Sequence, residues 1–164
     1  MKRLGLMLIS LLFPVAAFAQ TPTCEPFEIV SLDGRVVATH DEGDKGPSIG
    51  DIRVGERIIG DKEGRPIGEV RWKISLLDPD HDGKPSHNLL RMFFLFDNGS
   101  ILADGIHTPR NDIHDSEKVS APKTELVVLG GTGAFRHARG VIDLLPADDG
   151  NPEHVRYEVD ISCK

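Results

Sequence analysis

The two cysteines of this chain stand near opposite ends of its sequence, and their positions constrain the fold more than any other feature. The chain has 164 residues, and the cysteines are Cys24 and Cys163. In an oxidising compartment two such thiols pair, and the bridge requires the two ends of the chain to lie side by side. A closed β-barrel meets this demand directly, because its first and last strands are neighbours. We therefore predict one disulfide, with two free thiols as the alternative.

The start of the sequence predicts export. Two basic residues precede an almost wholly apolar run over residues 4–15, and the small residues Ala17 and Ala19 follow. This pattern is typical of a secretory signal peptide. The apolar run is shorter than the ~20 residues of a membrane-spanning helix, which disfavours the alternative of an uncleaved anchor. We expect residues 1–19 to be a signal peptide and 20–164 to be one domain in the periplasm or outside the cell, with no membrane span in the mature form.

The charge balance restricts the partners of the chain. Its 26 acidic and 19 basic side chains give a formal net charge of -7 at pH 7. A nucleic-acid-binding surface needs a positive field to meet the phosphates, so the composition argues against a nucleic-acid partner. Cationic or neutral small molecules are easier to accommodate than anions.

Strand patterns dominate the mature chain, and no segment shows a long helical period. Val70, Trp72 and Ile74 alternate with charged residues, which predicts a strand over residues 67–77 with one apolar face. About eight such strands, separated by regularly spaced turns, predict an antiparallel barrel or sandwich. The predicted terminal disulfide favours an all-β, eight-stranded antiparallel barrel, whose interior holds side chains or one small ligand.

Four segments resemble the dirigent proteins, which share an eight-stranded barrel with the allene oxide cyclases. Residues 129–140 read LGGTGAFRHARG and are similar to the family's G-G-T-G-x-F-x-x-A-R-G motif. Residues 98–105 are similar to its N-G-S-T-L-x-x-x-G hairpin, and His40-Asp41 stands where the family has a His-Asp pair. Residues 67–70 precede a strand much as the family's V-G-R-A-Q does. The order and spacing of all four segments agree.

The resemblance implies a mode of action. Barrels of this kind hold a small, largely apolar ligand in the lumen, and some steer radical coupling or stabilise a cationic intermediate with buried acids and an arginine. The chain is thus expected to bind a small apolar or phenolic molecule and to steer its cyclisation or coupling, an isomerase-like or dirigent-type activity without a cofactor. The resemblance also implies a homotrimer. Departures from the family at residues 37–39 and 69–71 weaken the expectation of plant-type chemistry.

The candidate site residues follow from the same match. Asp41 is the candidate acid, because a carboxylate at the mouth of a barrel can shuttle a proton, and Arg139 matches the family's Ala-Arg-Gly. Their alternatives are a solvated loop aspartate and an outward-facing arginine. We expect Asp41 and Arg139 to line one catalytic pocket, and five further residues to contact the ligand: His40, Val70, Trp72, Ile74 and Phe94.

One acidic loop has a pattern found in metal sites. Asp78, Asp80, Asp82 and Gly83 fit the first half of an EF-hand calcium loop, but Leu89 stands where the bidentate glutamate is needed. A calcium site completed from elsewhere and a plain acidic turn are both compatible with this pattern. The seven histidines show no metal-ligand spacing. We assign no metal site.

Three functions are compatible with such a barrel: an enzyme, a non-catalytic periplasmic carrier of a small ligand, and a packed structural or interaction protein. Polar groups that meet inside an otherwise apolar lumen would favour the enzyme. An apolar lumen without an ionisable group would favour the carrier. A lumen filled by Trp72 and the phenylalanines would favour the packed barrel.

Overall fold

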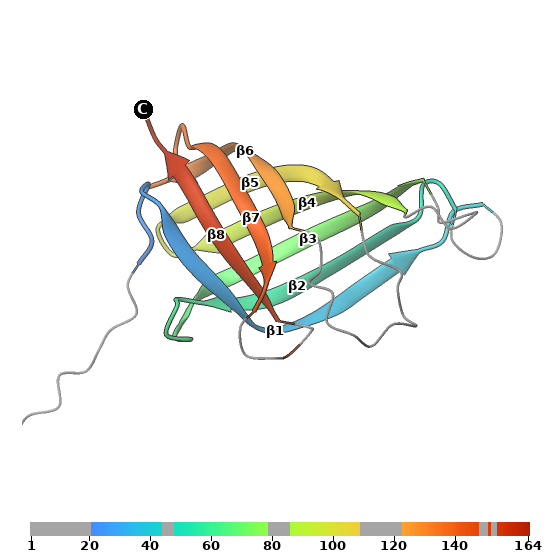
Figure 1. Ribbon diagram of the computed structural model, residues 1–164, viewed down its shortest axis with the longest axis horizontal. Helices are drawn as coiled ribbons and strands as arrows, with labels where there is room; N and C mark the ends of the chain where they lie inside the picture. Colours follow the sequence, from blue (N-terminus) through green and yellow to red (C-terminus); the bar gives the residue numbers. More distant parts are fainter. Residues whose placement is uncertain (1–20, 44–47, 79–85, 109–122, 148–150, 152–153) are drawn as a thin grey trace, which may run out of the picture.

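Eight strands account for the regular structure of a computed structural model, which describes residues 21–43, 48–78, 86–108, 123–147, 151 and 154–164. The strands are β1 (Phe27–His40), β2 (Ile52–Gly60), β3 (Pro66–Asp78), β4 (His87–Phe96), β5 (Gly99–His107), β6 (Thr124–Gly133), β7 (Arg139–Pro146) and β8 (Val155–Ser162). Each strand pairs antiparallel with the next, and β1 pairs with β8, so the barrel closes (Figure 1). The predicted eight-stranded antiparallel barrel is confirmed.

The predicted disulfide is present between Cys24 and Cys163. It links the segment before β1 to the residue after β8, and the two Cα atoms are 5.8 Å apart. The first and last strands are neighbours, as the bridge requires, with Phe27 opposite Val159. No helix in the described part of the chain is long and apolar enough to cross a membrane. The predicted signal peptide, residues 1–19, lies outside the described residues.

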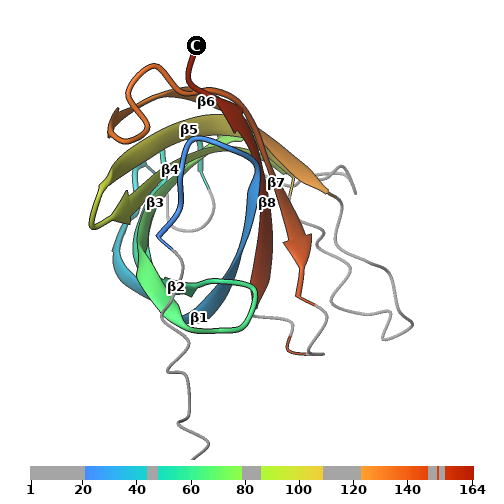
Figure 2. The ribbon, with the colours of Figure 1, turned by 90° about the vertical axis from the view of Figure 1, so that its left-hand side faces the viewer.

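The two ends of the barrel are built differently. At one end short connections join β2 to β3, β4 to β5 and β6 to β7, and the disulfide lies there; we call this the closed end. At the other end, which we call the open end, the four connections that leave β1, β3, β5 and β7 are all longer. Figure 2 looks onto the closed end and shows the strands as a ring. The predicted hairpin turn at Asn98-Gly99 belongs to the closed end.

Aromatic side chains fill the closed end. The rings of Phe27, Phe96 and Phe135 pack against one another, with centroids 5.2 to 6.3 Å apart. Phe135 belongs to a turn over residues 134–138, and β7 begins at Arg139. The turn places the Phe135 ring across the closed end, where it packs on Phe27 and Phe96 and closes the interior of the barrel.

Side chains alternate between the inner and outer faces. On β4, Phe94 is fully buried inside, whereas Phe93 is 40% exposed outside. The predicted apolar face of β3 points inward, since Val70 is fully buried and Trp72 and Ile74 pack against the same core. Apolar burial of this kind is the main stabilising contribution to such a barrel.

Candidate functional site

Cross-strand pairing brings a positive charge to the inner face. Directly paired residues of neighbouring strands point to the same side of a sheet. Val70 is fully buried on the inner face, and its partner on β2 is Arg57. On the other side Arg57 pairs with Gly34 of β1, where an added Cβ would collide with the Arg57 Cγ. The stem of Arg57 therefore leans over a glycine on the lumen side.

The indole of Trp72 lies next along β3 toward the open end. Its partner on β2 is Gly55, and an added Cβ there would collide with the indole ring. Trp72 Nε1 is buried and has no hydrogen-bond partner among the described residues. A buried donor left unsatisfied costs about 1–3 kcal/mol. This indole N–H can therefore donate to a ligand without first breaking a bond within the described part of the protein.

A histidine faces the lumen where β5 ends. His107 pairs with Asn88 of β4, which is 8% exposed on the inner face. His107 Nδ1 lies 2.9 Å from Oγ1 of Thr124, the buried first residue of β6. Burial lowers the pKa of His107 below its ordinary value of 6.5. The imidazole is thus neutral at neutral pH, and one of its two nitrogens is a proton acceptor.

Tyr157 of β8 is the single tyrosine of the chain, and its side chain is buried in the interior. Its ring packs edge to face on Phe94, with centroids 5.4 Å apart. Burial raises the pKa of Tyr157 to about 12, and the positive charge of Arg57 acts in the opposite direction. The field of the Arg57 guanidinium therefore reaches the middle of the lumen, where it favours negative charge on an oxygen.

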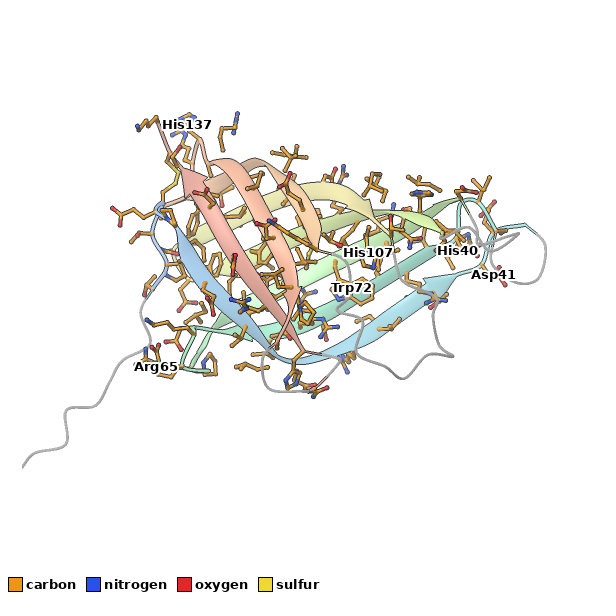
Figure 3. All side chains as sticks on the ribbon, in the orientation of Figure 1. His40, Asp41, Arg65, Trp72, His107 and His137 are labelled. Carbon is orange, nitrogen blue, oxygen red and sulfur yellow. A yellow bond between two sulfur atoms is a disulfide. The ribbon has the colours of Figure 1, made fainter. Side chains whose placement is uncertain are left out.

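We refer to five of these residues as the lumen site: Arg57, Trp72, His107, Thr124 and Tyr157. Figure 3 shows Trp72 and His107 midway along the barrel, between His40 at one end and His137 at the other. On the inner face of the described strands the ionisable residues are cationic or neutral, and no carboxylate is among them. The charged side chains on the inner faces of the described strands are thus cationic, although the whole chain is acidic.

The structure does not bring Asp41 and Arg139 together. Asp41 follows β1 at the open end and is exposed. Arg139 begins β7 at the closed end, opposite Ser162, and its guanidinium donates to the carbonyl of Ala138 at 2.6 Å. The expectation that both residues line one pocket is therefore wrong. A separate catalytic role for either residue stays a prediction.

Four of the five predicted ligand contacts face the lumen of the barrel, and His40 does not. Val70, Trp72, Ile74 and Phe94 face the lumen. The side chain of His40 is 67% exposed at the open end, and its Nε2 lies 2.8 Å from Glu42 Oε2. Contact between these residues and a ligand stays a prediction. Sequence reasoning missed Arg57, His107, Thr124 and Tyr157, although the alternation of apolar and charged residues over 155–161 marks Tyr157 as inward-facing.

The predicted acidic loop is only partly described. Asp80, Asp82 and Gly83 of the EF-hand-like pattern lie outside the described residues, and so does the histidine-containing loop over residues 109–122. Among the residues that the structure does describe, no group of three or more histidine, cysteine or acidic side chains is placed to hold a metal ion.

Comparison with known proteins relates the barrel to several solved structures. No family model and no curated protein sequence matches the chain. Pyocyanin demethylase is 20% identical, with a TM-score of 0.61 over 84% of this chain and 99% of that one. The Diels-Alderase AbmU from Streptomyces koyangensis is 12% identical, with a TM-score of 0.53 over 82% of this chain and 63% of that one.

A third solved structure is that of a dirigent protein. The pterocarpan synthase dirigent protein GePTS1 is 16% identical, with a TM-score of 0.51 over 83% of this chain and 80% of that one. This chain has the dirigent-type barrel fold. The resemblance predicted from the four sequence segments is thereby confirmed at the level of fold, and identities this low carry nothing further.

Proposed function

We propose that this barrel binds a small, largely apolar aromatic molecule in the open half of its lumen and steers the cyclisation or coupling of that molecule without a cofactor. The observation that carries the proposal is the buried, unpartnered Nε1 of Trp72. Buried hydrogen-bond donors in proteins nearly always have an acceptor, and a ligand oxygen would supply one for this N–H group. A preorganised donor in a site shielded from water also stabilises charge that develops during a reaction.

The walls around this donor suit such a ligand. Apolar side chains of β3 and β4, among them Ile74, Leu90 and Met92, flank the indole on the inner face. The phenylalanine cluster closes the other half, so the ligand would enter from the open end. Polar groups within an apolar interior favour the enzyme over the carrier, and the similar structures are named for a demethylase, a Diels-Alderase and a pterocarpan synthase.

The same proposal includes export and assembly. A disulfide between the two ends of the chain suits an oxidising compartment, which supports a periplasmic or secreted protein. The outer faces of β4, β5 and β6 expose large apolar side chains, namely Phe93, Ile106, Val127 and Leu129. Exposed apolar groups on adjacent strands favour an interface between copies of the chain, in line with the expected homotrimer.

Trp72 is the single tryptophan of the chain, so intrinsic fluorescence reports on the lumen alone. The mature protein would be titrated with naphthols, nitrophenols and their methyl ethers, with free N-acetyltryptophanamide as the control for inner-filter effects. We expect saturable quenching by at least one compound. Ile74→Phe, which narrows the inner face, should weaken binding about tenfold, whereas Lys73→Phe on the outer face should not. Failure of every compound to quench saturably would refute the proposal.

A further inference from the structure

His107 has the geometry of a proton-transfer residue rather than of a packing residue. Its ring is held at one nitrogen by the hydroxyl of Thr124, and its inner-face partner on β4 is the neutral Asn88. Neither neighbour is charged, so neither fixes the imidazole in its protonated form. A neutral histidine whose Nδ1–H donates to a hydroxyl has Nε2 as its proton acceptor.

We propose that His107 exchanges a proton with a hydroxyl group of the lumen ligand, and that the ligand is therefore a phenol. This inference rests on the proposed function, because it assigns a role within the same site. Nδ1–H donates to Thr124 Oγ1, and Nε2 accepts the proton of the ligand hydroxyl. The step leaves a phenolate and an imidazolium, and the proton returns to the oxygen, or to a carbon of the rearranged ligand, before release.

Two further groups of the lumen site stabilise the phenolate that this step creates. The Nε1–H of Trp72 is a donor without a partner among the described residues. The positive charge of Arg57 already favours the ionised form of the buried Tyr157 phenol, and it would act in the same direction on a ligand phenolate. A donor and a cation near one oxygen are the elements of an oxyanion site.

The charged groups that face this region are few. On the inner faces of the described strands, the titratable residues besides His107 are Arg53 and Arg57 on β2 and Tyr157 on β8. Burial raises the pKa of Tyr157 to about 12, so that phenol stays neutral near pH 7, and the pH response of the described site near neutrality belongs to His107. The charge of Arg57 favours the ionised form of the buried Tyr157 phenol, and burial alone lowers the pKa of His107.

The test uses 4-nitrophenol, whose phenolate has its own visible absorbance, and 4-nitroanisole, the methyl ether that has no proton to give. Binding of each is followed through Trp72, and the ionisation of bound 4-nitrophenol is followed by its absorbance as pH is varied. We expect the phenolate-to-phenol ratio of the bound probe to exceed that of the free probe about tenfold at the same pH. His107→Gln should reduce this excess, because the proton acceptor is lost while Trp72 and Arg57 remain, and should leave the binding of 4-nitroanisole within about twofold.

Two companion variants separate the proton transfer from a structural effect. Thr124→Val removes the hydroxyl that orients the ring and should reduce the excess, while His137→Asn, in an exposed turn at the closed end, should leave it unchanged. An undiminished excess in a folded His107→Gln protein would overturn the inference. Equal binding of both probes without any shift in the ionisation of 4-nitrophenol would also overturn the inference, but it would not contradict the proposed binding site in the lumen. Failure of both probes to bind would instead overturn the phenol class together with the proposed site.

Discussion

A matched pair of phenylalanine substitutions tests the assignment of inner and outer faces. Phe94→Ala removes a ring that is fully buried and packs on Tyr157 with centroids 5.4 Å apart. Truncation of a buried phenylalanine costs about 3–5 kcal/mol, of which an edge-to-face ring pair contributes about 0.5–1.5 kcal/mol. Phe93→Ala removes the neighbouring ring, which is 40% exposed on the outer face, and should cost about 1 kcal/mol or less in the monomer.

The assay is thermal unfolding of the oxidised protein, followed by far-ultraviolet circular dichroism at a concentration where the protein is monomeric. The melting temperature of Phe94→Ala should fall by about 6–20 °C, since 1 kcal/mol is worth about 2–4 °C in a domain of this size. Phe93→Ala should melt within a few degrees of the wild type. Equal destabilisation by the two changes would refute the assigned register of β4, and with it the inward direction of Arg57 and His107.

Three further predictions concern the disulfide, the histidine and the tryptophan. Replacing Cys24 and Cys163 together by serine should lower the free energy of unfolding by about 5 kcal/mol in the loop-entropy model, since 139 positions separate them; an unchanged urea midpoint would contradict this. The folded-state pKa of His107 lies below its unfolded value, so the unfolded chain binds more protons and the folded state loses stability as pH falls through the unfolded pKa of 6.5. His107→Gln should therefore lose less free energy of unfolding than the wild type between about pH 7.5 and about pH 5.5, as measured by urea unfolding. An identical loss in the variant would show that protonation of His107 does not cause it. Gly55→Ala should displace the Trp72 indole and shift its emission maximum, because an added Cβ would collide with the ring; an unaltered emission spectrum would contradict the contact.

The barrel could be predicted from the sequence because its signals are local or depend on the chain ends. The paired cysteines required adjacent termini, and the alternation around Val70 gave the inward face of β3. The predicted Asn98-Gly99 hairpin is present between β4 and β5. Each of these signals needs only a few residues and no knowledge of long-range register.

The place of Arg57 in the lumen site could not be predicted, because its inward direction depends on one register shift. Gly60 pairs with Pro66 across the turn between β2 and β3, and regular pairing from there would put Arg57 opposite Glu69 on the outer face. An irregularity after Ile59 moves the register by one residue and turns Arg57 inward, since one step reverses every side chain of a strand.

The topology of the barrel explains why Asp41 and Arg139 do not line one pocket. Asp41 follows the end of β1, and Arg139 begins β7. All odd-numbered strands of an antiparallel barrel run in the same direction, so the end of one and the start of another lie at opposite ends. Phe135 lies in the turn over residues 134–138 and its ring fills the closed end, so Arg139, which follows this turn, is fixed at the closed end.

The central claim is that the Trp72 indole donates to a ligand in the lumen, and the single tryptophan allows a direct measurement. A nitrogen–proton correlation NMR spectrum of the uniformly ¹⁵N-labelled protein contains one indole N–H signal. On titration with 4-nitrophenol, we predict that this signal moves downfield and saturates together with the fluorescence quenching, as a hydrogen bond to the ligand oxygen forms. An indole signal that stays in place while the probe saturates the protein would show that the ligand binds elsewhere, and would contradict the account.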